Sequence, residues 1–294
     1  MKIVVGLPAY NEENNIDQII SRIKKFSDMI IICDDGSTDN TLKIAKKHGV
    51  IIIEHSKNLG YGEAIKSIFS KFLKMDGDIL VTIDSDGQHD VNDIPKIIQP
   101  ILDAEGDLVI GSRFLDSQTS HIPTYRKFGI NAITKVTNIG TKQKITDSQS
   151  GFRAYKRDVL SNIFLSQSGM AVSTEILLKA DKKKFRIKEI PTKITYGKNT
   201  SKHNPFSHGL SVLVNTTKFV SIEHPLTFYG LPGIFLFMIG IVFIVWTLQI
   251  YSESNQIVTN IALIGLSSII LSVLLIITAI ILFTIVTVIR DENK

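Results

Sequence analysis

The sequence predicts an α/β domain with a mostly parallel sheet, followed by two membrane-spanning helices. Three observations lead to this prediction. Short apolar runs alternate with segments of helical periodicity through residues 3–110, a polar loop follows nearly every run, and two long stretches near the C-terminus carry no charge. Alternation of strands and helices along a chain is typical of a parallel sheet.

Five strands are expected in this first part of the chain. Each is a short run rich in Ile, Val and Leu, and helical spacing of apolar residues follows the first four runs and separates them from the next. The runs are Ile3–Leu7, Met29–Cys33, Val50–Ile53, Ile79–Ile83 and Leu108–Ile110. Residues 111–202 are expected to mix helices and strands.

Two uncharged stretches, residues 227–250 and 254–289, are long enough to cross a bilayer. A helix needs about 20 apolar residues to span the hydrocarbon core. The sequence therefore predicts spans at about 228–250 and 261–289, of which the second is long enough to tilt.

The expected organisation is a globular domain at residues 1–205, an amphipathic helix at 206–226 and a two-helix membrane domain at 227–294. The amphipathic helix can lie in the headgroup layer or pack on the globular domain. Gly230, Gly233 and Gly240 can bring helices close together, within one chain or between two chains of a homo-oligomer.

Charge flanking the spans predicts the orientation. The apolar run before Pro8 is too short for a signal peptide, and the connector at residues 251–260 carries no Lys or Arg. Lys218, Arg290 and Lys294 flank the other ends of the spans. By the positive-inside rule, the globular domain and both termini are expected to be cytoplasmic. The single cysteine suits that compartment.

The net charge of +5 and the pI near 9.1 indicate an anionic partner. Nucleic acid is not expected, because no run of Lys and Arg is interleaved with aromatic residues. The tightest cluster, Lys182–Lys184, is short and typical of a solvated helix end. Lipid headgroups of a bilayer and phosphorylated substrates account better for the charge.

Four polar loops follow the first four strands. Ligands bind parallel sheets outside the carboxyl ends of the strands, so these loops are expected to form one site. The loops are Pro8–Glu12, Asp34–Asp39, Asn58–Gly62 and Asp84–Gln88.

Asp84 and Asp86, with Gln88 following, are the candidate metal ligands. Hard oxygen ligands at this spacing suit Mg²⁺ or Mn²⁺, which would also bind a diphosphate and stabilise the charge on a departing nucleoside diphosphate. An acidic turn alone is usually only solvated. Its place after a buried strand favours metal binding here.

The other loops supply candidate nucleoside contacts. Asp35 can accept the ring N–H of uracil or the N–H edge of guanine, while its loop also caps the next helix. Tyr10 can stack on a base, although a loop tyrosine is more often packing, and Glu12 can reach the ribose or base. Asn58 and Gly60 lie in a turn that lets the backbone pass close to the bound nucleotide.

Cationic side chains follow the acidic loops. Arg113, Arg126, Arg153 and Lys202, with Ser201 beside it, can bind phosphate groups, although a surface role is the default for any single arginine.

Together these motifs resemble glycosyltransferase family 2, which has the GT-A fold, and in particular the dolichyl-phosphate mannose synthases and related polyprenyl-phosphate sugar transferases. The matching stretches lie in order through about the first 205 residues. They are Pro8–Glu12, Asp34–Asp39, Asp84–Gln88, Gly111–Arg113, Ser150–Arg153 and Ser201–Lys202. Gly87 and Ser85 depart from the Leu and Ala that are frequent in the family.

The resemblance implies a role for each group of residues. It implies that the nucleoside contacts Pro8, Tyr10, Glu12 and Asp35. It implies that metal and diphosphate bind Asp84, Asp86 and Gln88. Phosphate groups of the donor or acceptor are implied to bind Arg113, Arg126 and Lys202. The implied reaction is an inverting transfer of mannose or glucose from GDP-mannose or UDP-glucose to polyprenyl or dolichyl phosphate.

A lipid phosphate has a second pKa of about 6 and is already ionised at neutral pH, so it needs no strong base. Asp147 is the candidate base if the acceptor is instead a sugar hydroxyl or another lipid. A catalytically silent scaffold that binds nucleotide-sugar or recruits partners in the membrane is the alternative from another class. A processive synthase is disfavoured, because Trp246 is the only tryptophan and the Q-x-x-R-W motif is absent.

Overall fold

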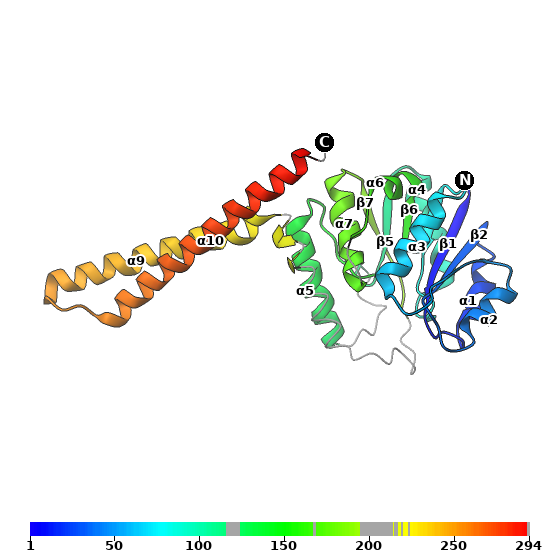
Figure 1. The fold of residues 1–294 in the computed structure, drawn as a ribbon, viewed down its shortest axis with the longest axis horizontal. Helices are drawn as coiled ribbons and strands as arrows, with labels where there is room; N and C mark the ends of the chain where they lie inside the picture. The colour runs from blue at the N-terminus through cyan, green and yellow to red at the C-terminus, as the bar shows by residue number, and fades with distance from the viewer. Residues whose placement is uncertain are drawn as a thin grey trace. The chain divides into compact units, whose positions relative to one another are not determined.

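The computed structural model describes residues 1–115, 124–166, 169–194, 214, 217–218, 220–222 and 224–292 (Figure 1). These residues fall into two compact units, Met1–Thr216 and Thr217–Lys294. Most of the amphipathic helix expected at 206–226 lies outside the described residues, and that expectation stays a prediction.

The first half of the N-terminal unit alternates strands and helices as the sequence predicts. Its elements are β1 (Ile3–Ala9), α1 (Ile16–Ile23), β2 (Met29–Asp34), α2 (Thr41–Lys47), β3 (Ile51–Glu54), α3 (Tyr61–Leu73), β4 (Ile79–Thr82), η1 (Val91–Asp93), α4 (Ile94–Leu102) and β5 (Leu108–Ser112). The second half is mixed, as expected. It consists of α5 (Thr124–Gly140), β6 (Arg153–Lys156), α6 (Arg157–Asn162), η2 (Gly169–Ala171), α7 (Val172–Lys182) and β7 (Ile187–Pro191).

The described strands form one seven-stranded sheet in the order β3-β2-β1-β4-β6-β5-β7. Every neighbouring pair is parallel except those of β6, which runs antiparallel between β4 and β5. The chain winds outward from β1 to β3 and then returns to place β4 on the other side of β1. Ligands bind at such a reversal, outside the carboxyl ends of the strands.

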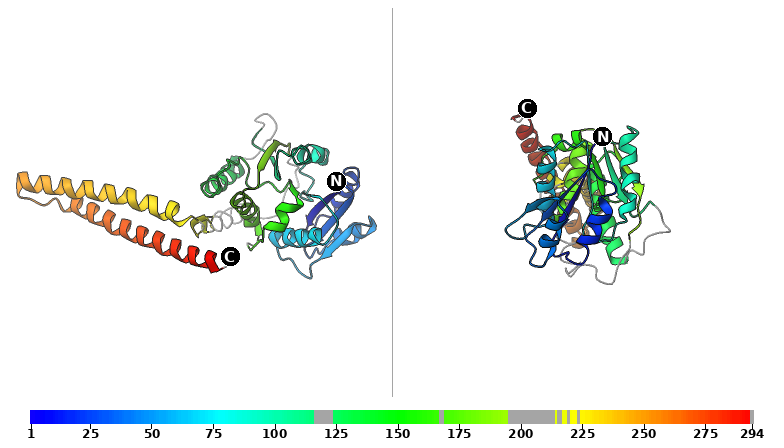
Figure 2. Two further views of the ribbon diagram at one scale, coloured as in Figure 1. Left: turned by 90° about the horizontal axis from the view of Figure 1, so that it is seen from above. Right: turned by 90° about the vertical axis from the view of Figure 1, so that its right-hand side faces the viewer.

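Helices cover both faces of this sheet (Figure 2). On one face α1, α2 and α4 pack over alternate strand residues such as Val5 and Ile32. On the other face α3, α6 and α7 pack over Val4 and Ile31. Because the central strands are buried on both sides, they read as continuous apolar runs rather than as alternating ones.

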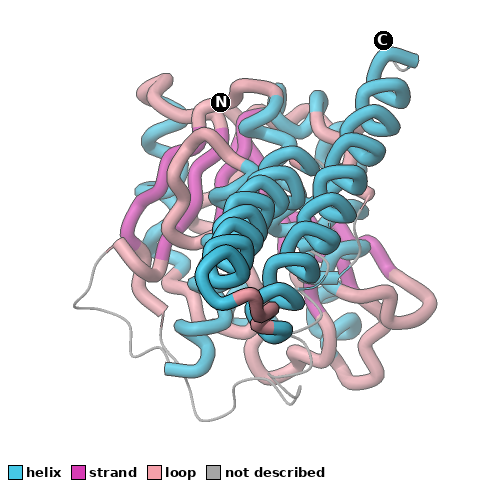
Figure 3. Tube along the Cα trace, turned by 90° about the vertical axis from the view of Figure 1, so that its left-hand side faces the viewer, coloured by secondary structure: helices cyan, strands magenta, loops and turns pink. Residues whose placement is uncertain are grey.

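The C-terminal unit is a helical hairpin (Figure 3). A π-helical turn, η3 (Leu226–Gly230), leads into α9 (Leu231–Ser254), and α10 (Thr259–Glu292) returns beside it. The helical segments Leu226–Ser254 and Thr259–Val288 are long and apolar enough to cross a membrane, as predicted.

Glycines bring the two helices of the hairpin into close contact. A Cβ added at Gly240 would lie 2.5 Å from Ile269 Cγ1 and 3.1 Å from the carbonyl oxygen of Gly265. One at Gly233 would lie 2.8 Å from Ile276 Cγ1. These glycines therefore pack within one chain, and pairing between chains stays a prediction.

Replacing Gly240 by alanine should destabilise the hairpin, because the added methyl group would push the α10 backbone away. We expect a loss of about 1–3 kcal/mol, as for overpacking in other well-packed interiors. Thermal unfolding in detergent, followed by the fluorescence of Trp246 in α9, would report on this unit. Gly230→Ala is the matched control, since its Cβ would meet only Ala279 Cβ at 3.7 Å. Equal melting temperatures for the two variants would contradict the packing argument.

Candidate active site

The ends of β1, β2 and β4 meet at one edge of the sheet and are fastened to one another. The register places Ala9 opposite Asp34. The Ser85 hydroxyl donates to the carbonyl oxygen of Pro8 at 2.7 Å. Asn11, at φ 56°, receives a hydrogen bond on Oδ1 from the Thr38 N–H at 2.8 Å. The structure thus brings three of the predicted loops together.

Asp84 and Asp86 flank the buried Ser85, whose inward hydrogen bond leaves both carboxylates at the partly exposed edge. The Gln88 N–H donates to Asp86 Oδ1 at 3.0 Å, which closes a turn in which Gly87 adopts φ 73°. A left-handed φ suits glycine, so Gly87 fits this turn.

Burial, and after it the charge of the neighbouring Asp86 carboxylate, raise the pKa of Asp84 to about 7. The charge of Arg113 and a hydrogen bond from the Tyr61 hydroxyl oppose this shift. Gly151 lies so close that an added Cβ would meet both carboxylate oxygens of Asp84 at 2.5 Å. Two carboxylates crowded in this way favour a divalent cation.

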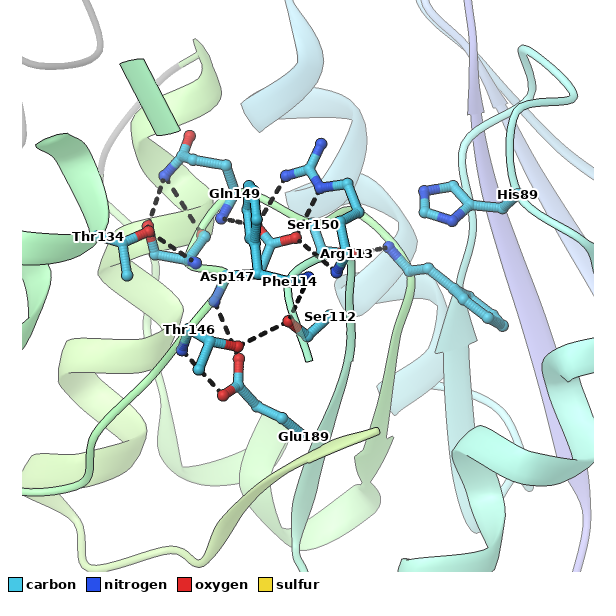
Figure 4. Close-up of polar contacts among 12 residues, drawn as sticks. His89, Ser112, Arg113, Phe114, Thr134, Thr146, Asp147, Gln149, Ser150 and Glu189 are labelled. Atoms are coloured by element: carbon cyan, nitrogen blue, oxygen red, sulfur yellow. Dashed lines mark hydrogen bonds and ion pairs between the residues drawn. The ribbon is translucent and has the colours of Figure 1, made fainter. Parts of the chain in front are cut away.

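Arg113 and Asp147 form a buried ion pair beside this acidic loop (Figure 4). Arg113 Nε donates to Asp147 Oδ2 at 2.6 Å, and Nη2 donates to Oδ1 at 2.7 Å. The Asp147 side chain is fully buried. Burial alone would raise its pKa, but the charge and hydrogen bonds of Arg113 outweigh burial and lower it. This geometry suits a carboxylate that positions Arg113 more than one that accepts a proton.

The loop that carries Asp147 is fixed by β7. Glu189 accepts hydrogen bonds from the backbone N–H groups of Thr146 at 2.8 Å and Asp147 at 3.0 Å (Figure 4). The hydroxyl of Thr146 also lies 2.7 Å from that of Ser112. These contacts hold the acidic partner of Arg113 in place before any ligand binds.

Arg153 has a structural position, not the surface position expected of a phosphate ligand. Its side chain is only 1% exposed, and its guanidinium donates to the carbonyl oxygens of Ser148, Ser150 and Ser173 at 2.8–2.9 Å. None of these partners is charged, so its positive charge remains to oppose the raised pKa of Asp84.

His89 lies beside this cluster and directly follows Gln88 (Figure 4). Its ring packs on Phe152 at 5.3 Å between centroids, and Nε2 lies 3.9 Å from Asp84 Oδ2. Burial lowers its pKa to about 3, so the imidazole is neutral. Its Nδ1 is buried with no hydrogen-bond partner among the described residues.

The nucleoside candidates lie on the β1 and β2 side of the edge. Tyr10 and Glu12 are partly buried, and Glu12 accepts from Asn15 Nδ2 at 2.8 Å. Burial raises the pKa of Glu12. Asp35 is buried and accepts from the backbone N–H groups of Leu59 at 3.0 Å and Gly60 at 2.8 Å. Asp35 therefore connects the second and third predicted loops.

The remaining candidates are only partly located. Asn58 is exposed in the turn before α3. Arg126 lies in the first turn of α5, but its side chain is outside the described residues, as are Ser201 and Lys202. Their phosphate-binding roles stay predictions.

Several residues of this edge were missed by reasoning from sequence. They are His55, Tyr61, His89 and Glu189. His89 continues the loop Asp84–Gln88, and Tyr61 lies within the predicted loop Asn58–Gly62, so both carried a local signal. His55 and Glu189 reach the site from segments that no motif marks.

Residues 4–164 match the model of the family described as Glycosyl transferase family 2. The chain belongs to glycosyltransferase family 2.

Curated family members include two archaeal relatives. The UDP-N-acetylglucosamine–dolichyl-phosphate N-acetylglucosaminyltransferase of Methanococcus voltae is 35% identical over 215 residues, covering 66% of this chain and 86% of that protein. The dolichol-phosphate mannosyltransferase of Pyrococcus furiosus is 31% identical over 208 residues, covering 67% of this chain and 57% of that protein.

Solved structures show the same fold. The glucosyl-3-phosphoglycerate synthase of Mycobacterium tuberculosis, crystallised with Mn²⁺, UDP-glucose and phosphoglyceric acid, has a TM-score of 0.58 and 22% identity. The match covers 74% of this chain and 80% of that one. This likeness confirms the GT-A architecture predicted for the N-terminal unit.

Asp147→Asn should destabilise the N-terminal unit by about 3 kcal/mol, because it breaks a buried ion pair and leaves Arg113 without its charged partner. Chemical unfolding would measure this. Asp107→Asn is the matched control, since Asp107 makes the same hydrogen bonds to the exposed Arg186. This variant should lose much less stability, because exposed ion pairs contribute little.

The same pair predicts a dependence on pH. The pKa of Asp147 is lowered in the folded protein, so its contribution to stability is present above the unfolded pKa of about 3.9 and is lost as pH falls through the folded value. The loss of stability in acid should therefore be smaller in Asp147→Asn. Identical acid profiles for wild type and variant would contradict this assignment.

Proposed function

We propose that this protein transfers a sugar, with inversion, from a nucleotide-sugar to a polyprenyl phosphate at the cytoplasmic face of a membrane. One observation carries the proposal. The acidic loop Asp84–Asp86 and the fixed cation Arg113 meet at one sheet edge, in a family 2 chain that also has two helices of membrane-spanning length. Relatives named for transfer to dolichyl phosphate support the acceptor class.

The proposed roles follow the loops. The nucleoside lies against the β1 and β2 ends, the diphosphate at the acidic loop, and the acceptor phosphate near the cations. The proposed nucleoside contacts are Pro8, Tyr10, Glu12, Asp35, Asn58 and Gly60. The proposed metal and diphosphate contacts are Asp84, Asp86 and Gln88. The proposed contacts of the acceptor phosphate are Arg113, Arg126, Ser201 and Lys202.

The donor set at the acidic loop fits Mg²⁺ or Mn²⁺. The charge of Asp86 raises the pKa of Asp84, and a divalent cation relieves this repulsion between the two carboxylates. Two carboxylates and the Gln88 amide leave coordination positions for diphosphate oxygens. A bound ion would supply positive charge for the leaving nucleoside diphosphate.

The state of Asp147 favours a phosphate acceptor over a hydroxyl acceptor. A hydroxyl needs a base to remove its proton, whereas a phosphate monoester is already ionised near neutral pH. Asp147 is buried, paired with Arg113 and has a lowered pKa, so it is a poor base. Arg113 is instead poised to hold an anion.

The orientation of the spans follows the charges that flank them. The connector between α9 and α10 carries no Lys or Arg, and Lys218 and Arg290 lie beyond the other ends. Cytoplasmic termini place the N-terminal unit on the side where nucleotide-sugars are made.

The test is to incubate membranes that contain the protein with polyprenyl phosphate, a divalent ion and one of three radiolabelled donors. These donors are GDP-mannose, UDP-glucose and UDP-N-acetylglucosamine. We expect one of them to give labelled lipid that can be extracted into organic solvent. Asp86→Ala should abolish the label by removing a metal ligand. Asp103→Asn is the control, because Asp103 is exposed and, among the described residues, its side chain is hydrogen-bonded only to Gln99.

Label in lipid that is lost in Asp86→Ala would support the proposal. Donor binding without labelled lipid would reject the polyprenyl phosphate acceptor and leave a hydroxyl acceptor. Failure to bind any of the three donors would leave a scaffold without catalytic function as the better description.

Binding of Mn²⁺ should strengthen as pH rises toward and through 7. Asp84, with a pKa of about 7, must lose its proton to bind the ion, so affinity should fall about tenfold per unit below that pH. Titration calorimetry from pH 5.5 to 8 would measure this. Asp84→Asn should bind weakly at every pH, and binding by this variant as tight as by the wild type would rule out Asp84 as a ligand.

A further inference from the structure

His55 holds the carboxylate of Asp35 from behind. Its Nδ1 lies 2.7 Å from Asp35 Oδ1, and its Nε2 lies 2.9 Å from the Ser67 hydroxyl. A carboxylate only accepts hydrogen bonds, so Nδ1 carries a proton that it donates to Asp35. The side chains of His55 and Asp35 are 10% and 5% exposed, so this arrangement is fixed inside the fold.

The protein therefore occupies most of the accepting capacity of Asp35. Oδ1 receives His55 Nδ1 and the Leu59 N–H, while Oδ2 receives the Gly60 N–H. A carboxylate has about four acceptor positions, two on each oxygen. Among the residues that the structure describes, two donors therefore fill Oδ1 and one position remains on Oδ2.

The neighbouring carboxylate does not add a second reachable acceptor. Asp34 is 2% exposed, and its Oδ2 accepts from the Ser37 N–H at 3.1 Å. Its Oδ1 is buried below the surface, out of reach of a ligand in this conformation.

Nucleobases differ in the number of N–H groups that they present at this edge. Uracil offers a single ring N–H, between two carbonyl groups. Guanine offers its ring N–H and its adjacent amino group together, and a carboxylate satisfies both only with both of its oxygens. A donor that enters a buried site and finds no acceptor loses its hydrogen bond to water without replacement.

We propose that His55 is a specificity-determining residue: by filling Oδ1 of Asp35 it leaves one acceptor, and so selects a uracil nucleotide over a guanine nucleotide. The inference rests on the proposed function, which places Asp35 at the base edge. It narrows the donor to a uridine diphosphate sugar.

The test is binding of UDP and of GDP to the full-length protein in detergent with Mn²⁺, by titration calorimetry. UDP should bind at least about tenfold more tightly, the cost of one unsatisfied N–H. His55→Leu removes the donor to Oδ1 and should narrow the preference to within about threefold. His55→Asn, which can keep an N–H toward Asp35, should retain it.

Equal or tighter binding of GDP by the wild type would overturn the inference, whatever the variants do. A purely structural role for His55 would weaken UDP and GDP by the same factor in His55→Leu, and an unchanged ratio would also overturn it. Lipid labelled from a GDP-sugar would reject this inference and keep the proposed function. A preference for UDP without labelled lipid would support this inference and reject transfer to polyprenyl phosphate.

Discussion

The buried ion pair between Arg113 and Asp147 is the contact around which the active edge is organised. Taking both charges out of water is costly, and the two short hydrogen bonds between them offset that cost only when their geometry is good. Glu189 supplies that precision by fixing the Asp147 backbone from β7. The edge strand β7 thus fixes the partner of the cation that follows the neighbouring strand β5.

Arg153 complements this pair from inside the fold. Its three hydrogen bonds go to neutral carbonyl groups, so its charge is satisfied as a donor but not neutralised. Asp84 lies close by, and Gly151 is small enough to let it approach. The positive charge of Arg153 thereby offsets part of the negative charge of the acidic loop. This lets the two carboxylates stay close together and still attract a cation from solution.

The sequence predicted five of the strands, the loops at the ends of four of them and both apolar helices. Each of these features shows in the local sequence as an apolar run or a periodic pattern. It did not predict the pairing of Arg113 with Asp147, which lie 34 residues apart, or that of Asp35 with His55, 20 residues apart. Pairings of this kind depend on the sheet order, and β6 enters that order antiparallel with no signal in its four residues. Arg153 was misread as a surface cation for the same reason.

The loops are bound to one another as much as to the sheet, and this bears on catalysis. Ser85 holds the acidic loop to Pro8, and Asp35 holds the turn at Gly60 to the end of β2. A site whose polar groups are already oriented need not reorganise them when charge develops on a leaving group. Ser85 lies between the two acidic residues, so its hydrogen bond to Pro8 fixes the stretch of backbone that carries both carboxylates.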